Sequence, residues 1–327
     1  MALADRYDLV KLLGEGSFGQ VFRALDRSLG RVVAVKVLHR QDNDARRRFH
    51  REGVILHSQM ENEFVVGLLD HTGLDDEDPY LVLEFCELGS LRSWVGMGRG
   101  WRDVVTALLH AARGLAGIHL AGTFHRDIKP ENMLVARVQV GSGWKVKLAD
   151  FGLAGFPHAV TGKMTRSAGG TEGYMAPEIL AGDEFHPPAD IYSLGVVGVE
   201  LLTGATHVAA LHACRAPDAL KALIQSMVSG RASARPTASD VVRMLTVLLQ
   251  TTTVSLPKPS HDPQPRPTVT LPQQRAGMSS TLATSVAAVG LGAILFGIVS
   301  RIGARNGVYY DSTVDRNRGG DGRFRRG

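Results

Sequence analysis

Two parts of the N-terminal region carry residue types suited to binding phosphate. Gly14, Gly16 and Gly19 form a G-x-G-x-x-G pattern, and a backbone without Cβ atoms can turn tightly and approach phosphate oxygens. Lys36 lies in an apolar run, where phosphates and the carboxylate of Glu52 would neutralise its charge. Each feature alone has an ordinary explanation, namely a hairpin turn, a lysine that reaches solvent, or one more charge on a polar helix.

Strand-like residues follow the glycines. A dinucleotide-binding fingerprint requires a strand, the glycines and then a helix. Here residues 21–23 and 32–36 are rich in β-branched and aromatic side chains. The pattern therefore argues against a Rossmann-type site and favours a phosphate-binding hairpin.

Three later segments carry acids, amides and cations. Residues 125–132 read His-Arg-Asp-Ile-Lys-Pro-Glu-Asn, residues 150–152 read Asp-Phe-Gly, and residues 176–178 read Ala-Pro-Glu. In this order and spacing, together with the glycines and Lys36, they resemble the signature set of protein kinases. The resemblance covers residues 7–249 and implies phosphoryl transfer, which depends on positioning and on neutralising charge at the γ-phosphate.

The resemblance implies a role for each matching polar residue. Asp127 would accept the proton of the substrate hydroxyl, and Lys129 would steady the transferring phosphate. Asn132 and Asp150 would hold Mg²⁺, a hard cation that prefers carboxylate and amide oxygens. The implied cofactors are therefore ATP and Mg²⁺.

The resemblance also implies how ATP would be held. Lys36 would bind the α- and β-phosphates, Glu52 would fix its position, and the backbone of residues 84–86 would hydrogen-bond the edge of the adenine. The predicted nucleotide-binding set is Leu13, Gly14, Gly16, Gly19, Val21, Ala34, Lys36, Glu52, Glu84, Cys86 and Leu134, of which Val21, Ala34 and Leu134 would sandwich the ring.

The catalytic loop indicates which hydroxyl is phosphorylated. Lys129, followed by Pro130 and Glu131, resembles the serine/threonine version of the loop, and Thr171 before Tyr174 agrees with it. Protein substrates with Ser or Thr acceptors are therefore expected. A small-molecule phosphotransferase would generally lack the Ala-Pro-Glu segment. The other alternative is a pseudokinase scaffold, which binds nucleotide without phosphoryl transfer.

Arg126 beside the predicted base could bind a phosphate on the activation loop, because phosphate–arginine bonds can order a mobile segment. The candidate hydroxyls are Thr161, Thr165 and Ser167, and the spacing from Ala176 favours the last two. By the same resemblance, Asp190 would brace the catalytic loop, Glu178 and Arg235 would form a buried ion pair, and Leu56, Leu68, His125 and Phe151 would form an apolar spine between the lobes.

The hydrophobic pattern predicts the elements that position these residues. Strand-like runs such as 32–38 and 80–85 are interrupted by one helix at about 42–60. Another helix is predicted at 101–121, with later ones at 191–202, 220–228 and 239–249. The expected fold is α+β, a two-lobed kinase domain over residues 1–250. Its β-rich N-lobe with one regulatory helix covers about 1–85, and its mainly helical C-lobe covers about 86–250.

Composition excludes some classes of protein. Residues 1–250 carry a net charge of −1, because the basic excess lies in the C-terminal region, and this balance does not predict nucleic-acid binding. Two cysteines, Cys86 and Cys214, are too few for a disulfide framework and fit a reducing cytosol. The first thirty residues contain no apolar signal-peptide core. The oligomeric state is not predicted.

The C-terminal residues form three segments of different composition. A Pro-rich linker is predicted at 251–277, and residues 278–300 form an uncharged helix whose apolar part, 282–299, would span about 27 Å. Residues 301–327 form a basic tail expected to be disordered. The interpretation is a single-pass membrane anchor with the kinase domain facing the cytosol. The alternative is a helix packed on the domain or on a partner, in a cytoplasmic protein.

Overall fold

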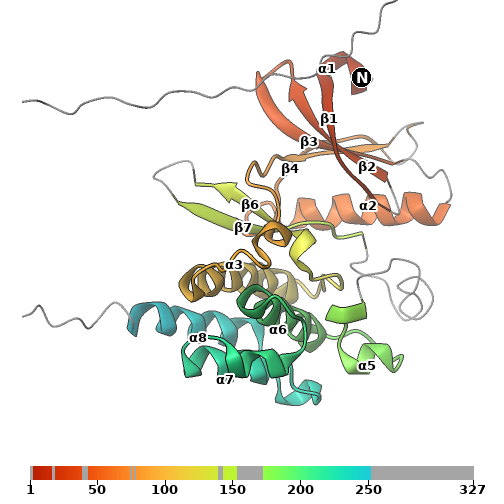
Figure 1. Cartoon of the computed structure of the whole chain (residues 1–327). Coiled ribbons are helices and arrows are strands. Elements are labelled where there is room, and N and C mark those ends of the chain that lie inside the picture. The colour runs from red at the N-terminus through yellow and green to blue at the C-terminus, as the bar shows by residue number, and fades with distance from the viewer. Residues whose placement is uncertain are drawn as a thin grey trace, which may run out of the picture. The chain divides into compact units, whose positions relative to one another are not determined.

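The computed structural model of the chain describes residues 3–16, 19–38, 43–73, 76, 79–138, 143–152 and 172–251. They belong to one compact unit, Met1–Ser260 (Figure 1). The predicted hydrophobic helix and basic tail, and the predicted linker after Thr251, lie outside the described residues. Within the described ranges, no helix is long and apolar enough to cross a membrane.

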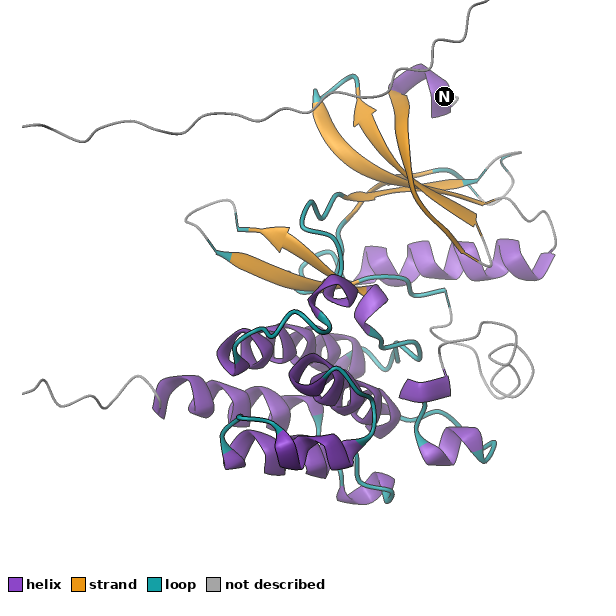
Figure 2. Ribbon diagram, in the orientation of Figure 1, coloured by secondary structure: helices purple, strands orange, loops and turns teal. Residues whose placement is uncertain are grey.

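The N-terminal lobe is built on a five-stranded antiparallel sheet with the order β1-β2-β3-β5-β4 (Figure 2). Its strands are β1 (Tyr7–Gly16), β2 (Gly19–Asp26), β3 (Arg31–Leu38), β4 (Leu68–His71) and β5 (Tyr80–Glu84), after a short helix α1 (Leu3–Arg6). Successive side chains of a strand point to opposite faces. Val33 and Val35 of β3 pack into a cluster with Tyr7, Ala24, Tyr80 and Val82. Ala34 and Lys36 consequently face the other side.

Helix α2 (Asn43–Ser58) lies beside this sheet and buries two charged residues, Arg48 and Glu52. Phe49, Ile55 and Leu56 are buried, as helical spacing predicted. Glu52 is also buried, with 2% of its surface exposed. A carboxylate in such a place requires a partner, which the site supplies.

The C-terminal lobe is mainly helical. Its long helices are α3 (Trp101–Leu120), α6 (Pro187–Thr203), α7 (Asp218–Met227) and α8 (Ala238–Thr251). Short helical segments are η1 (Leu91–Trp94), η2 (Pro130–Asn132), η4 (Glu172–Tyr174), α5 (Pro177–Leu180), η5 (Val208–Ala213) and η6 (Ala232–Ala234). Gly198 lets α6 pack closely, since a Cβ there would lie 3.1 Å from Leu108 Cδ1 of α3. The predicted division into a β-rich and a helical lobe is confirmed.

A second sheet interrupts the helical lobe and was not predicted. It pairs β6 (Met133–Arg137) with β7 (Trp144–Leu148) as an antiparallel hairpin. Val135, Val146 and Leu148 are completely or almost completely buried, and in β7 the buried residues alternate with Lys145 and Lys147. The hairpin positions the site, because β6 begins directly after Asn132 and β7 ends two residues before Asp150.

A histidine beneath this hairpin is held in its neutral form. The His110 ring on α3 stacks on Phe64 with ring centroids 5.2 Å apart, and it lies 5.8 Å from the Trp144 ring. Its Nδ1 accepts a hydrogen bond of 3.2 Å from the backbone N–H of Val146. Burial lowers the pKa of His110 to about 4.

We expect acid to destabilise the fold partly through His110. Its folded-state pKa lies below the ordinary value, so the unfolded chain takes up the proton first and stability falls as the pH drops from about 6.5 to about 4. The contribution at pH 7 is on the order of 2 kcal/mol after allowance for partial exposure. Urea unfolding at pH 7 and pH 5 should show a smaller loss for His110→Asn, which keeps an acceptor, than for the native chain. Exposed His212→Asn is the control, and equal losses in all three would contradict the assignment.

Candidate active site

Three charged side chains from three elements meet in the predicted phosphate site. Nζ of Lys36 in β3 lies 2.8 and 2.7 Å from the two carboxylate oxygens of Glu52 in α2. It also lies 3.1 Å from Oδ1 of Asp150, which follows β7. Burial disfavours the charged ammonium, but attraction by Asp150 and Glu52 outweighs this effect and raises the pKa of Lys36. The lysine is therefore a permanent cation in the site.

The two carboxylates beside Lys36 differ in exposure. Glu52 is buried, whereas 48% of the Asp150 side chain is exposed. The Lys36 charge lowers the pKa of Asp150, so this carboxylate is ionised at neutral pH. Glu52 thus holds the lysine in place, and Asp150 keeps an accessible, charged face for a ligand.

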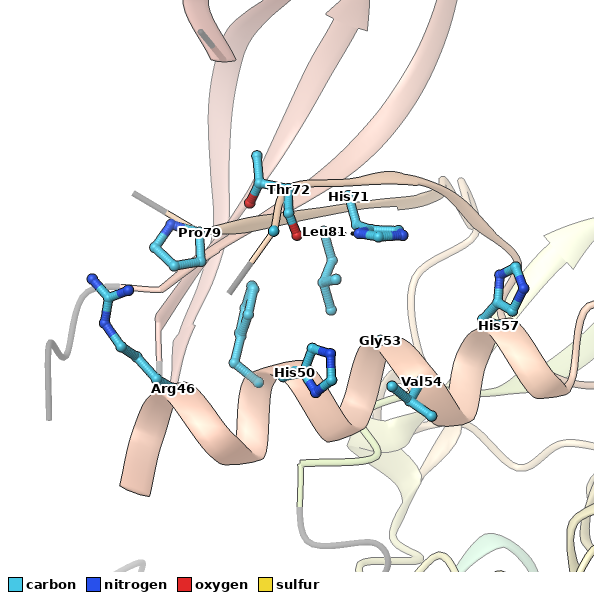
Figure 3. Close-up of a pocket in the computed structure, with 11 residues that line it drawn as sticks. Arg46, His50, Gly53, Val54, His57, His71, Thr72, Pro79 and Leu81 are labelled. Atoms are coloured by element: carbon cyan, nitrogen blue, oxygen red, sulfur yellow. Dashed lines mark hydrogen bonds between the residues drawn. The ribbon is translucent and has the colours of Figure 1, made fainter. Parts of the chain in front are cut away.

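A cavity of about 230 Å³ lies between α2 and the strands β4 and β5 (Figure 3). His50, Gly53 and Val54 of α2 line one side, and Pro79 and Leu81 lie opposite. None of the predicted site residues lines it. Gly53, the neighbour of Glu52, lets the helix approach the sheet here, because a Cβ would lie 3.1 Å from Leu81 Cδ2.

The predicted phosphate loop joins β1 to β2. Gly16 pairs with Gly19 and Gly14 pairs with Val21, while residues 17–18 between the strands lie outside the description. A Cβ on Gly19 would lie 2.1 Å from the carbonyl oxygen of Val37 in β3, so no larger residue fits. A Cβ on Gly14 would meet nothing within 4 Å. Packing therefore explains Gly19, whereas the space beside Gly14 is open to a ligand.

The predicted adenine walls come from both lobes. Ala34 of β3 pairs with Leu83 of β5, and Leu83 and Leu134 pack around buried Cys86. Burial raises the pKa of the Cys86 thiol to about 12, so the side chain stays neutral. Val21 is half-buried and Leu13 is exposed. Cys86 therefore contributes an apolar surface to this site and no reactive thiolate.

The predicted adenine-binding segment 84–86, here called the hinge, begins with Glu84. This residue is held by the surrounding backbone and by a lysine. Its N–H donates to the carbonyl of Gly67 over 2.9 Å. Its carboxylate accepts a 2.7 Å bond from Nζ of Lys147 on β7. Sequence analysis missed this ion pair, which joins the hinge to the strand that leads to Asp150.

The loop between α3 and η2 carries the predicted catalytic residues. Asp127 is 8% exposed, and its Oδ2 lies 2.7 Å from Nζ of Lys129. The Asn132 amide donates to both the backbone carbonyl and Oδ2 of Asp127, each over 2.8 Å. Within the described residues, Oδ1 of Asp127 is buried and has no hydrogen-bond partner. A buried acceptor without a donor is suited to receive the hydroxyl of a substrate.

Helix α6 fixes the backbone of this loop. Oδ2 and Oδ1 of Asp190 accept bonds of 2.9 Å from the N–H groups of His125 and Arg126. Arg126 has a φ of 69° and Asp150 a φ of 64°, a left-handed conformation that side chains other than glycine rarely adopt. The His125 ring packs 4.7 Å from Phe151. Both unusual backbone positions thus flank the candidate site.

The predicted metal ligands fit a hard cation held jointly with phosphates. Asn132 uses its amide N–H groups on Asp127, which leaves its carbonyl oxygen as a ligand. Asp150 offers a half-exposed carboxylate. The described part of the chain contains no group of three His, Cys, Asp or Glu residues that could hold a metal by themselves. One carboxylate and one amide oxygen would need phosphate oxygens or water to complete the coordination shell of such a cation.

Other predicted residues lie in supporting positions or outside the described ranges. Guanidinium nitrogens of Arg235 lie 2.6 and 2.8 Å from the Glu178 carboxylate. Thr161, Thr165, Ser167 and Thr171 lie outside the described residues. Sequence analysis missed Arg92, which bonds to Glu131 of the catalytic loop. Its partners are far away in the chain, so no local signal indicated them.

Comparisons with known proteins support one family. The protein kinase domain model matches residues 7–246. Serine/threonine-protein kinase PknL of Mycobacterium tuberculosis is 37% identical over 213 residues, which cover 62% of this chain and 51% of PknL. Probable serine/threonine-protein kinase PknB of Corynebacterium glutamicum is 35% identical over 213 residues, covering 62% of this chain and 32% of PknB.

A third relative extends the match. Serine/threonine-protein kinase A of Synechocystis is 34% identical over 277 residues, which cover 73% of this chain and 52% of that protein. The chain thus spans from about a third to about half of the length of these curated relatives.

Proposed function

Because the chain belongs to the protein kinase domain family, we propose that it transfers the γ-phosphate of ATP to Ser or Thr hydroxyls of proteins. The similar curated proteins are named as serine/threonine kinases. The observation that carries the proposal is Oδ1 of Asp127, which has no hydrogen-bond partner among the described residues and is held beside Lys129 and Asn132. Within the described ranges this atom is a proton acceptor without a donor, in a chain whose Lys36 suits a nucleotide phosphate and whose Asp150 suits a hard cation.

The residues divide the reaction between them. Oδ1 of Asp127 would accept the proton as the hydroxyl oxygen attacks the γ-phosphorus and the bond from that phosphorus to the bridging oxygen of ADP breaks. Lys129 would balance the charge on the transferring group. Lys36, fixed by Glu52, would hold the α- and β-phosphates. Asn132 and Asp150 would hold Mg²⁺, which when bound neutralises charge on the phosphates.

Transfer of radiolabelled phosphate from ATP to a generic basic protein tests the proposal. We expect transfer that depends on added Mg²⁺ and places label on Ser or Thr. ATP binding without transfer to any of a broad set of peptides would indicate the pseudokinase alternative. Label on a small metabolite alone would indicate a different phosphotransferase.

We also propose that phosphorylation of the activation loop raises activity. Arg126 lies directly before Asp127 and is partly buried, and burial lowers the pKa of its guanidinium. Asp190 favours the Arg126 cation, whereas the positive charge of Arg51 on α2 repels it. A phosphate would relieve this repulsion and link α2, which carries Glu52, to the catalytic loop.

A variant with Thr161, Thr165 and Ser167 all changed to Ala is expected to lose at least about tenfold in kcat/KM, a typical effect of ordering one segment. Phosphopeptide mapping of the native chain should locate the phosphate at Thr165 or Ser167. Full activity of the triple variant, with no phosphate elsewhere on the loop, would rule out this regulation.

We propose further that residues 278–300 anchor the chain in a membrane, with the kinase domain on the cytosolic side. Support comes from the sequence alone, since residues 276–300 are uncharged and 282–299 are mostly apolar. Deletion of residues 276–327 should move the protein from the membrane fraction to the supernatant and leave kcat within about twofold, because the deleted segment lies outside the family match. Full-length protein in the supernatant would contradict the anchor.

A further inference from the structure

Arg92 of η1 forms hydrogen bonds with residues from three other parts of the C-terminal lobe. Its guanidinium donates to the two carboxylate oxygens of Glu131 over 2.7 and 3.2 Å, and to Oε1 of Glu200 over 2.6 Å. It also donates to the hydroxyl of Tyr174 over 2.6 Å. The Tyr174 hydroxyl in turn donates to Glu200, and Ser193 of α6 donates to the Tyr174 carbonyl. We call Arg92, Glu131, Glu200 and Tyr174 the Arg92 cluster.

The Arg92 cluster borders the place where an acceptor must arrive. Glu131 lies on the catalytic loop, four residues after Asp127 and directly before Asn132. The amide of Asn132, the neighbour of Glu131, lies 2.8 Å from Oδ2 of Asp127, and Tyr174 is joined to Glu131 through Arg92. A substrate hydroxyl that reaches Oδ1 of Asp127 therefore brings the neighbouring residues of its peptide close to these side chains.

The charges of the cluster do not balance. One guanidinium faces two carboxylates, of which Glu200 is 9% exposed and Glu131 is 46% exposed. The hydrogen bonds that Arg92 donates to Glu131 above all raise the pKa of Arg92, so its charge persists at any pH at which the chain folds. Without Arg92, a nearly buried carboxylate and a half-exposed one would lose the guanidinium that bonds to both of them. A basic side chain from a peptide would be their natural partner.

We propose that Arg92 is a positioning and specificity-determining residue. It holds Tyr174 against the catalytic loop, and it occupies the two carboxylates so that acceptor peptides with basic residues are not favoured. This inference rests on the proposed kinase function. It assigns the chain a substrate class, namely acceptor sequences without a requirement for Arg or Lys beside the hydroxyl.

The test compares peptides that differ by one Arg. A neutral Ser/Thr peptide phosphorylated by the native full-length chain is resynthesised with a single Arg at each of the four positions on either side of the acceptor. We expect native kcat/KM values within about threefold of each other across the set. In Arg92→Gln, at least one Arg-containing peptide should exceed the neutral peptide by about tenfold, because an uncompensated carboxylate pair gains a cation.

Three further variants distinguish the effect of the lost charge of Arg92 from an effect on the structure. Arg92→Lys keeps a cation but cannot bridge three partners, so the peptide KM should rise without a preference for Arg. Arg92→Gln/Glu200→Gln removes the charge imbalance and should abolish the new preference. Arg99→Gln is the matched control, because Arg99 has a similar exposure of 40% and contacts Trp94 of the same η1 segment. It should behave as the native chain does.

The outcomes distinguish this inference from the proposed function. If the native chain transfers phosphate but Arg92→Gln shows the native peptide ratios, the inference is wrong. A rise in the KM for ATP together with lowered stability and unchanged peptide ratios would show a merely structural role and also overturn it. If Arg92→Gln does not fold, Arg92→Lys provides the test. The inference is then wrong if Arg92→Lys shows the native peptide KM as well as the native peptide ratios. Lack of transfer by the native chain to any peptide would instead refute the kinase proposal.

Discussion

Asp127→Asn is expected to lower kcat by about 10²–10⁴-fold, the usual contribution of a positioned general base. The replacement keeps the size of the side chain, and its amide oxygen can still accept the bonds from Lys129 and Asn132. An amide N–H₂ would then take the place of Oδ1, the atom that has no partner among the described residues. The variant loses the proton acceptor while the geometry of the loop is preserved. Steady-state transfer of labelled phosphate measures the effect.

The control for this prediction is Asp103→Asn on α3, a residue far from the catalytic loop in the chain whose side chain is 44% exposed. It should retain native activity. ATP affinity and the unfolding midpoint of Asp127→Asn should stay close to native values, since the ion pair and side-chain hydrogen bonds described for Asp127 join it to Lys129 and Asn132, while Lys36 pairs with Glu52. An Asp127→Asn variant with more than about a tenth of the native kcat would remove Asp127 from the role of base.

Lys36→Met is expected to abolish activity and to destabilise the fold at the same time. The ammonium binds Glu52 over 2.7 Å and Asp150 over 3.1 Å, and Glu52 is buried. Removal of one partner leaves a buried carboxylate unpaired, which typically costs about 3–5 kcal/mol. Loss of the phosphate-binding cation should lower kcat/KM by about 10²–10³-fold. Urea unfolding and phosphate transfer measure the two effects.

A second change separates the two effects of Lys36→Met. In Lys36→Met/Glu52→Gln the buried carboxylate is also removed, so most of the lost stability should return while activity does not. Lys11→Met on β1 is the matched control, because Lys11 is exposed. If the double variant were as unstable as the single one, the buried pair would not be the cause. An active Lys36→Met would remove Lys36 from the phosphate site.

The sequence predicted correctly those features that depend on short, continuous segments of the chain. The helices predicted at 42–60 and 101–121 correspond to α2 at Asn43–Ser58 and α3 at Trp101–Leu120, because each repeats apolar residues at helical spacing. The order of the signature segments also led to Lys36, Glu52 and Asp150, which the structure brings together. Local pattern and motif order were sufficient for these features.

Contacts between residues far apart in the chain could not be predicted. Arg92 reaches Glu131, Tyr174 and Glu200, which follow it by 39, 82 and 108 residues. The reason for Gly19 likewise lies in the carbonyl of Val37 on a neighbouring strand. Such requirements depend on which backbones approach one another, and residue type alone does not encode that approach.

The hydrogen bonds of Asp190 attach the loop that carries Asp127, the proposed base, to the helical lobe. One carboxylate of α6 accepts from the backbone of His125 and Arg126 and contacts His119 of α3. Asp127 is therefore anchored in the interior of the helical lobe, whereas Lys36 and the glycines belong to the sheet. If the lobes separate to exchange nucleotide, ADP can leave with its contacts to the sheet loosened while the acceptor chemistry stays assembled. Each new turnover would then begin from a base that is already in place.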